Sequence, residues 1–354
     1  MNILEELSLT QPLRPLNQQA MEAARRRWNS IAKPLHSLGL LEDDLVRMAG
    51  ILDSADVNLS RRAVVVMCAD NGVVAEGVTQ TGQEVTAIVA ENIAKGDASV
   101  CRMAHLAHAS VYPVDIGVAR PLTWETIIQA CVRRGTRNMV LENPMTKAET
   151  LAAIRTGVEI AGRLKQDGFR LIATGEMGIG NTTTSSALAS VLMGLPVETV
   201  TGRGAGLSDE GLARKQNAIR KAILRSKPSP DDPLGALEKL GGLDIAGLAG
   251  LCIGGAVWRV PILLDGFISA AAALCAVRML PETADFLFAS HVSKEPAAHL
   301  ILKELGLCPL ITANMALGEG TGAVAAMPLL DMGLAVYDEM RTFEEIDVEA
   351  YKPL

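Results

Sequence analysis

The stretch that decides the fold is Ala63–Ala69, AVVVMCA, which runs directly into the polar turn Asp70-Asn71-Gly72. An unbroken apolar run of this length is typical of a strand that is buried on both faces of a parallel sheet. The same pattern, an apolar run followed by a polar cluster, recurs at residues 110–114, 169–173, 260–264 and 286–289. Ligands of such sheets bind beyond the carboxyl ends of the strands, so a functional site is expected at these polar clusters.

Helical segments separate the apolar runs. Residues 84–95 and 146–166 each end close to a glycine, as helices with a glycine cap do. Residues 181–193 and 208–221 open with polar capping residues. Strands that alternate with helices predict an α/β fold, a Rossmann-like, mainly parallel sheet flanked by helices.

The two ends of the chain differ from its middle. Residues 1–59 read as helical and polar-amphipathic, and residues 327–351 look helical and polar again. We expect the two ends to meet in a small helical domain, formed by residues 1–59 together with 327–354. Residues 60–326 would then form a large α/β catalytic domain.

The composition fits a large core and disfavours several classes of protein. Of the 354 residues, 49% are hydrophobic but only 3% are aromatic, so the core must consist of Ala, Val, Leu, Ile and Met. The net charge of −7 disfavours a nucleic-acid partner, and the short basic run Arg25–Arg27 is more typical of a solvated helix face than of an anion patch. The apolar region 245–277 contains Arg259 and Asp265, which disfavours a membrane span.

The cysteines and the N-terminus point to a reducing compartment. The cysteines form no CxxC pair and lie mostly in apolar stretches, so buried reduced thiols explain them better than disulfides or zinc. The N-terminus is acidic and has no basic segment before an apolar core, so no signal peptide is expected. The sequence therefore predicts a cytoplasmic protein without a metal site.

The strongest local motif is TGEMGIGNTT, residues 174–183, in which a strand end, a glycine-rich turn and a helix start follow one another. Small residues let backbone N–H groups approach an anion, and the helix N-terminus adds partial positive charge. The motif lacks the Gly-Lys-Ser/Thr ending of a P-loop and is not the dinucleotide-binding GxGxxG. Glu176 in its middle would suit ribose hydroxyls, whereas a purely structural turn has no need of it.

Two further segments have the composition of a phosphate site. TGRGAG, residues 201–206, precedes a helix that bears Lys215, which either binds phosphate or is a solvated surface lysine. SHVSKEP, residues 290–296, offers hydroxyl groups. Its His291 is either catalytic or a hydrogen-bonded structural residue, and no Ser or Cys nucleophile is matched to it.

A last motif, LGEGTG at residues 317–322, places Glu319 between two glycines. This arrangement is poor for a helix and lets the backbone come close to a ligand. A plain surface loop is the alternative, but functional residues concentrate on loops at strand ends. We therefore expect Glu319 to be functional.

These motifs occur together and in one order, namely DNGV (70–73), QEVT (83–86), GEMGIGNTT, TGRGAG, SHVSKEP and LGEGTGA. In this combination the chain resembles the nicotinate-nucleotide–dimethylbenzimidazole phosphoribosyltransferases over essentially its whole length. The resemblance implies transfer of phosphoribose from nicotinate mononucleotide to 5,6-dimethylbenzimidazole or a related lower-ligand base. The products would be an α-ribazole-type 5′-phosphate and nicotinate, in the assembly of the cobalamin nucleotide loop.

The resemblance also implies roles for individual residues. Glu319 matches the general base, and Glu176 matches a residue near the ribose. The nucleotide and phosphate contacts would come from Gly178, Gly180, Asn181, Gly204, Lys215 and Ser293. The base pocket would be formed by Thr81, Val89, Met177 and Leu317. Asp265 would either support a hydrogen-bond network close to the active site or be purely structural at its strand end, and Asp70 would shape the floor of the site as a supporting residue.

The chemistry of that reaction agrees with these residue types. The leaving nicotinate is already a pyridinium and needs no general acid, while the incoming base must lose a proton, for which one carboxylate suffices. Inversion at C1′ follows if the base attacks opposite nicotinate, and nearby carboxylates would ease the developing positive charge. No metal and no cofactor are expected. The expected partners are small-molecule substrates, with no nucleic acid and no membrane, and the resemblance implies a homodimer.

The predicted base pocket departs from the family in two places. Gly82 stands where a proline is common, and Val89 stands where some members carry a glutamine. The resulting slot is mostly apolar and discriminates weakly, because one methyl group is worth only about 1–3 kcal/mol. Substituted benzimidazoles, purines and phenolic bases therefore stay open as acceptors.

Two other functions compete with this one. A nucleotide-dependent kinase predicts a lysine-bearing phosphate loop, which the sequence lacks. A non-catalytic or partner-dependent subunit of a related phosphoribosyltransferase, acting on phenolic or purine bases, would have little need of Glu319.

Overall fold

The computed structural model describes residues 3–351 and contains a six-stranded sheet in the order β3-β2-β1-β4-β5-β6. Every pair of neighbouring strands is parallel. The strands are β1 (Arg62–Ala69), β2 (Ala109–Gly117), β3 (Ile128–Gln129), β4 (Leu171–Met177), β5 (Ile262–Leu264) and β6 (Leu287–Ala289). The predicted α/β class with a mainly parallel sheet is confirmed.

Strand β1 lies in the middle of the sheet and is buried on both faces. Val65 and Met67 pack into one apolar cluster, whereas Val64, Val66 and Cys68 pack into the other, and none of these side chains is exposed. Successive side chains of a strand point to opposite faces, so a strand covered on both sides must be apolar throughout. This is the physical reason for the uninterrupted run AVVVMCA.

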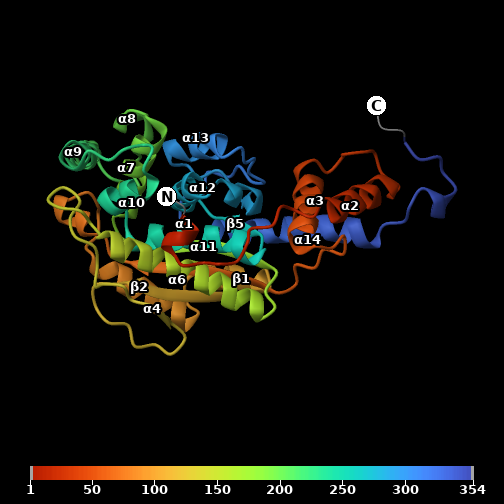
Figure 1. Ribbon diagram of the computed structural model, residues 1–354, viewed down its shortest axis with the longest axis horizontal. Coiled ribbons are helices and arrows are strands. Elements are labelled where there is room, and N and C mark those ends of the chain that lie inside the picture. The colour runs from red at the N-terminus through yellow and green to blue at the C-terminus, as the bar shows by residue number, and fades with distance from the viewer. Residues whose placement is uncertain (1–2, 352–354) are drawn as a thin grey trace.

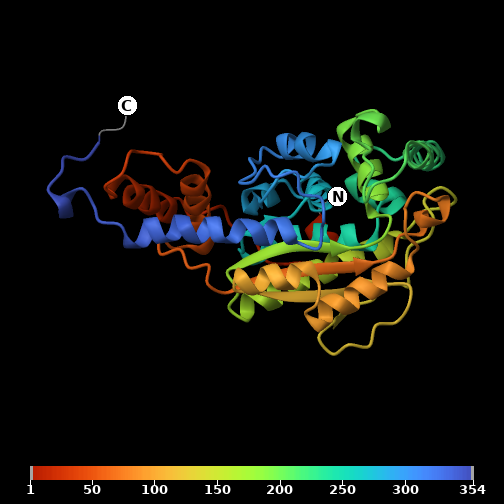
Figure 2. The same ribbon diagram turned by 180° about the vertical axis from the view of Figure 1, so that it is seen from behind.

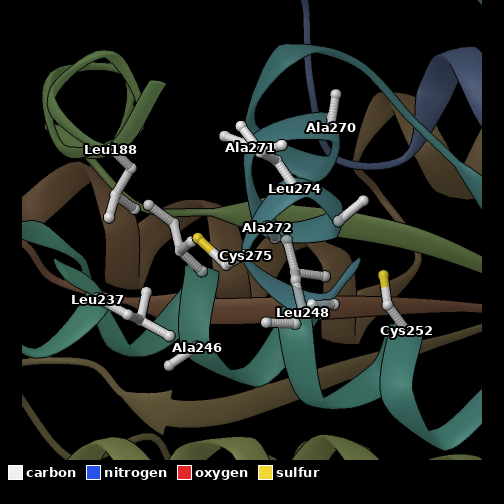
Figure 3. Packing of buried hydrophobic residues seen from close by; sticks show 14 of the residues in the cluster. Leu188, Leu237, Ala246, Leu248, Cys252, Ala270, Ala271, Ala272, Leu274 and Cys275 are labelled. Carbon is white, nitrogen blue, oxygen red and sulfur yellow. The ribbon is translucent and has the colours of Figure 1, made fainter. Parts of the chain in front are cut away.

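One face of the sheet is covered by α6 and α11, with the other helices of the central region packed around them. Figure 3 shows side chains of α7, α10, α11 and α12 meeting in the apolar layer on this side. These helices are α6 (Lys147–Gln166), α7 (Asn181–Met193), α8 (Val197–Val200), α9 (Asp209–Ser226), α10 (Pro233–Leu240), α11 (Leu243–Trp258), α12 (Phe267–Met279) and α13 (Pro296–Glu304).

Helices α6 and α11 approach each other unusually closely. A Cβ atom on Gly250 of α11 would lie 1.9 Å from the carbonyl oxygen of Ile154 in α6, and one on Gly157 would lie 2.1 Å from the carbonyl oxygen of Gly247. Glycine at these positions removes the side chains that would separate the two backbones. Close packing of small residues therefore compensates for the scarcity of aromatic side chains in the core.

The other face is covered by α4 (Glu84–Lys95), α5 (Ser99–Leu106) and the first part of α14 (Thr321–Glu339), whose buried side chains share one apolar cluster with β1. Helix α3 (Leu40–Leu52) adds its buried side chains to the same cluster beyond the sheet. As the sequence predicts, α4 ends at Gly96, which adopts φ +82. A short 3-10 turn, η1 (Gly72–Glu76), follows β1, and another, η2 (Pro281–Phe286), precedes β6.

The N- and C-terminal segments meet at one end of the molecule. Helix α2 (Gln18–Ser30) and α3 lie against the distal half of α14, which extends away from the sheet (Figures 1 and 2). The rings of Trp28 and Tyr337 lie 5.0 Å apart, and Arg27 Nε donates to the Tyr337 carbonyl oxygen at 3.0 Å. Ile31 forms an antiparallel bridge with Thr342.

The division into two domains stays a prediction, and two details complicate its boundaries. Helix α14 passes from residue 326 to residue 327 without interruption. The first helix, α1 (Ile3–Glu6), packs with the α/β region, because Ile3 and Leu7 belong to the cluster around α6 and α11, and Glu6 pairs with Lys147 at 2.8 Å.

The predicted C-terminal helix is wrong at both ends. Residues 327–351 were expected to be helical, but α14 begins at Thr321 and ends at Glu339. Beyond it, the helical structure of the described chain is limited to the 3-10 turn η3 (Glu344–Ile346). The early start has a tertiary cause, because the carboxylate of Asp265 accepts hydrogen bonds from the first N–H groups of α14.

Candidate active site

A cavity of about 300 Å³ opens at the carboxyl ends of β4, β5 and β6. This volume lies at the lower end of the range of small-molecule sites, ~300–1,000 Å³. Its walls come from loops that are far apart in the sequence, including residues 78–81, 176–182, 203–207 and 316–319. The position is the one that an open parallel sheet favours for a ligand.

Most of the residues that the sequence singles out line this one cavity. They are Thr81, Val89, Glu176, Met177, Gly178, Gly180, Asn181, Gly204, Asp265, Ser293, Leu317 and Glu319. Lys215 and Asp70 do not line it. The structure thus brings together segments that the motifs alone could only suggest as neighbours.

Lys215 lies directly behind the cavity wall. It is fully buried, and its Nζ donates to Thr182 Oγ1 at 2.9 Å and to the Gly202 carbonyl oxygen at 3.0 Å. Burial lowers its pKa to about 8, while the negative charge of Glu295 opposes that shift. The alternative of a solvated surface lysine is therefore wrong.

Asp70 supports the site from a greater distance. Its Oδ2 accepts from the Ala119 N–H at 2.7 Å, and it also receives a hydrogen bond from Thr86. The Thr86 hydroxyl in turn accepts from the Ile179 N–H at 3.1 Å, inside the glycine-rich turn. Thr86 thus ties α4, which carries Val89, to that turn.

Glu319 occupies an unusual backbone conformation. Its φ is +62, and its neighbours Gly318 and Gly320 have φ +87 and +94. A left-handed conformation is costly for a glutamate, by roughly 1–2 kcal/mol. The loop packs directly against β4, where a Cβ on Gly175 would lie only 2.6 Å from the Glu319 carbonyl oxygen.

The Glu319 carboxylate stands at the cavity wall near the start of α5. Its Oε2 accepts from the Val100 N–H at 3.5 Å. Burial raises the pKa of Glu319, the Val100 N–H opposes the shift, and the charge of Asp265 adds to it. A carboxylate with a raised pKa is a better proton acceptor than an ordinary surface glutamate.

Glu176 is more deeply buried than Glu319. Its Oε2 accepts a short hydrogen bond from Asn181 Nδ2. Burial raises the pKa of Glu176 to about 8; the Asn181 bond opposes the shift, and the charges of Asp244, Asp265 and Glu319 reinforce it. Glu176 is therefore mostly protonated at neutral pH.

Asp244, which the sequence reading missed, completes this acidic cluster. It is fully buried near the start of α11 and accepts from Asn181 Nδ2 at 3.1 Å and from Asn71 Nδ2 at 3.5 Å. Burial raises its pKa to about 6. The only sequence signal was an acid at the edge of a long apolar region, and nothing local linked it to Asn181.

His291 lies between β6 and the start of α14. Its Nδ1 is 3.1 Å from Ser290 Oγ and 4.0 Å from Asp265 Oδ1. Burial lowers the pKa of His291, against the effect of the Asp265 charge. The ring packs against Gly322, where a Cβ would lie 1.9 Å from Nδ1. These contacts favour the structural interpretation of His291 over a catalytic one.

The residues of the predicted base pocket line another part of the cavity wall. Leu317 is 55% exposed there, which is high for a large apolar side chain. Gln80 Nε2 donates a short hydrogen bond to the Gly206 carbonyl oxygen, so the loop before α4 is tied to the loop before α9. The apolar lining from Val89, Met177 and Leu317 suits a flat aromatic ring.

Within residues 3–351, no group of three or more His, Cys, Asp or Glu side chains is placed to hold a metal ion. The same part of the chain contains no helix that is both long and apolar enough to cross a membrane.

Comparison with known proteins identifies the family. A family model described as "Phosphoribosyltransferase" matches residues 13–348. The nicotinate-nucleotide–dimethylbenzimidazole phosphoribosyltransferase of Clostridium acetobutylicum is 44% identical over 347 residues, which cover 98% of this chain and 99% of the relative. The enzyme of the same name from Acetivibrio thermocellus is 45% identical over 338 residues, 96% of each chain.

A solved structure agrees with these relatives. The crystal structure of CobT from Thermus thermophilus matches with a TM-score of 0.89 and 41% identity, covering 94% of this chain and 99% of that one. The chain belongs to the family of the nicotinate-nucleotide–dimethylbenzimidazole phosphoribosyltransferases.

Proposed function

We propose that this chain transfers phosphoribose from nicotinate mononucleotide to 5,6-dimethylbenzimidazole or a related base, with Glu319 as the general base. The observation that carries the proposal is the Glu319 carboxylate at the cavity wall, between two glycines and beside the apolar lining of Met177 and Leu317. The names of the relatives support the choice of substrates. The products are an α-ribazole-type 5′-phosphate and nicotinate.

The reaction uses one proton acceptor. One ring nitrogen of the incoming base attacks C1′. The bond from C1′ to the pyridinium nitrogen breaks, and its electron pair stays on that nitrogen, so the ring of the released nicotinate is neutral. The other ring nitrogen loses its proton to Glu319. Attack opposite nicotinate inverts C1′ and gives the α-linked product.

The acidic cluster suits the charge that develops during this step. Positive charge grows on the ribose ring as the pyridinium departs, and fixed negative groups stabilise such charge in a cavity of low polarity. Asp265 and Glu319 line the cavity. Glu176 lines it too, and because burial raises its pKa to about 8, we propose that it donates a hydrogen bond to a ribose hydroxyl rather than acting as a fixed charge.

Another part of the cavity wall suits the phosphate. Gly178 and Gly180 line the cavity at the N-terminus of α7, where the helix dipole favours an anion. Gly204 and Ser293 line the same side, and Lys215 stands behind it. We propose that this group binds the 5′-phosphate of both substrate and product.

The acceptor pocket is apolar, so it should discriminate weakly between acceptor bases. Val89 offers no hydrogen bond to an acceptor, so we propose that several benzimidazoles, purines or phenols compete with 5,6-dimethylbenzimidazole. The homodimer remains a prediction from the family resemblance, and the cytoplasmic location remains a prediction from the sequence.

The test is turnover by the purified chain. Nicotinate mononucleotide and 5,6-dimethylbenzimidazole are incubated with the parent and with Glu319→Gln, and nicotinate and the new nucleotide are measured by chromatography. We expect the variant to lose roughly 10²–10⁴-fold in rate, the usual contribution of a general base. Glu304→Gln is the matched control, because Glu304 pairs with Arg278 on the surface of α13, outside the cavity.

Two results would contradict the proposal. Equal rates for the parent and Glu319→Gln would remove Glu319 from its role. A parent that makes no product with any base in a panel of benzimidazoles, purines and phenols would favour the partner-dependent subunit instead.

A further inference from the structure

A carboxylate of the chain itself lies in the region that we assign to phosphate. Glu295 lines the cavity, and its Oε1 accepts from the Gly204 N–H at 3.0 Å. Its Oε2 is buried and has no hydrogen-bond partner among residues 3–351. A buried carboxylate oxygen without a donor is an unfavourable arrangement, so this contact is one that a better ligand can replace.

The loop before α9 closes tightly over this carboxylate. A Cβ on Gly202 would lie 2.1 Å from Glu295 Oε2, so only glycine permits the approach. The Gly202 carbonyl oxygen also accepts from Lys215 Nζ. A backbone N–H donor, a buried cation and a carboxylate thus occupy one small region.

This combination has the chemistry of an anion site that already contains an anion. A backbone N–H in a glycine-rich turn and a lysine are the groups that bind phosphate. A phosphate dianion and the Glu295 carboxylate would repel each other there, since their interaction is only weakly screened away from water. The two cannot both use the Gly204 N–H.

We propose that Glu295 is a built-in competitor for the phosphate subsite, whose carboxylate leaves the Gly204 N–H when a phosphomonoester binds. The identity of that phosphomonoester as the nucleotide rests on the proposed function. The affinity for the nucleotide is then set in part by the displacement of Glu295.

The local structure allows the displacement. Glu295 precedes α13 in an extended conformation, with φ −65 and ψ 139, and its side chain makes one hydrogen bond. The next residue, Pro296, opens the helix and is itself exposed. Rotation of the Glu295 side chain toward solvent therefore breaks no helix contact.

A purely structural role for Glu295 predicts the opposite effect. If the carboxylate only holds the loop of residues 201–206 in place, removing its charge or its hydrogen bond loosens the phosphate contacts. If Glu295 competes with phosphate, its replacement should tighten phosphate binding, whereas if Glu295 supports the loop, its replacement should weaken phosphate binding. The sign of the change separates the two.

The experiment measures the binding of nicotinate mononucleotide, inorganic phosphate and 5,6-dimethylbenzimidazole to the intact parent chain and to Glu295→Gln. Glutamine keeps the shape and an acceptor for the Gly204 N–H but has no charge. We expect nicotinate mononucleotide and inorganic phosphate to bind on the order of tenfold more tightly to the variant at about pH 6.5, with the base unaffected. Glu304→Gln controls for the change in net charge, and thermal melting checks the fold.

A pH series adds a second readout. Burial lowers the pKa of Lys215 and the charge of Glu295 opposes that shift, while Lys215 Nζ donates to Thr182 and to the Gly202 carbonyl oxygen. Without the Glu295 charge the pKa of Lys215 falls further below its value of about 8, so the gain in affinity should shrink above neutral pH. A loop that was merely loosened would weaken binding at every pH.

Each outcome decides the question. The proposal would be overturned if Glu295→Gln bound phosphate and nucleotide no more tightly than the parent does. It would also be overturned if the affinity for the free base rose by the same factor. Glu295→Ala repeats the test without any acceptor for Gly204 and should shift the affinity in the same direction. Failure of the proposed function is visible separately, as a parent that binds inorganic phosphate but turns over no nucleotide.

Discussion

The carboxylate of Asp265 holds the loop that carries Glu319. Asp265 Oδ2 accepts from the Gly320 N–H at 3.2 Å, immediately after Glu319, and Oδ1 accepts from the Gly322 N–H at 2.7 Å. One side chain at the end of β5 thus caps α14 and fixes the left-handed turn that points Glu319 along the cavity wall. In this arrangement Asp265 is a positioning residue for the general base.

Replacing Asp265 by asparagine should damage both catalysis and stability. The asparagine amide has a single oxygen that can accept, and its NH2 group can only donate, so at least one N–H of the turn loses its partner. We expect turnover to fall on the order of 10²-fold, because a small misplacement of a reacting group costs that much. Steady-state kinetics and thermal melting measure the two effects, with Glu339→Gln at the far end of α14 as the control.

A merely structural role for Asp265 would lower the melting temperature without moving the pH profile. Because the charge of Asp265 raises the pKa of Glu319, the variant should also show its acid limb at lower pH. An unmoved acid limb would contradict the positioning role.

The pH dependence of the parent should report Glu319. A general base acts only when deprotonated, and burial raises the pKa of Glu319 above its ordinary value of 4.5. We expect kcat/KM for the acceptor to fall as pH decreases through that raised pKa, after correction for titration of the acceptor itself. A profile that is flat down to the ordinary range of glutamate would count against Glu319 as the base.

Glu176 should make the folded protein less stable as pH rises. Its pKa is raised from 4.5 to about 8 in the folded state, so between these values the folded chain holds a proton that the unfolded chain has released. The unfolded state therefore binds fewer protons, and the free energy of unfolding falls as pH increases through this window.

Glu176→Gln removes that dependence. We expect the stability of the variant relative to the parent to rise between about pH 5 and about pH 8, as measured by chemical denaturation. Asp244 titrates in both proteins, so its contribution largely cancels in the difference between their free energies of unfolding. A difference that does not change with pH would show that Glu176 is ionised in the folded state.

Gly250→Ala tests the packing of α6 against α11. The added Cβ would lie 1.9 Å from the Ile154 carbonyl oxygen, which belongs to a helix backbone and cannot move alone. We expect a loss of about 3 kcal/mol in the free energy of unfolding, typical of severe overpacking. Gly211→Ala in α9 is the control, because its Cβ meets only the flexible Leu207 side chain and should change stability by less than about 1 kcal/mol.

Most of the cavity lining was predicted through the family resemblance, whereas the sequence by itself determined the parallel sheet and the helix limits at residues 84–95 and 181–193. These features follow from local rules: an apolar run must be buried, a glycine ends a helix, and polar side chains after parallel strands gather at one edge. The motifs around Glu176 and Glu319 were recognisable for the same reason, since each lies within a few residues of a strand end or a helix start.

Only the tertiary structure decided which distant groups act on these residues. The start of α14 at Thr321 depends on Asp265, the orientation of Asn181 depends on Asp244, and the contents of the phosphate region depend on Glu295. Each of these contacts joins segments that are far apart along the chain, and its strength comes from burial away from water. A sequence pattern records spacing along the chain, whereas burial and contact between distant segments exist only once the chain has folded.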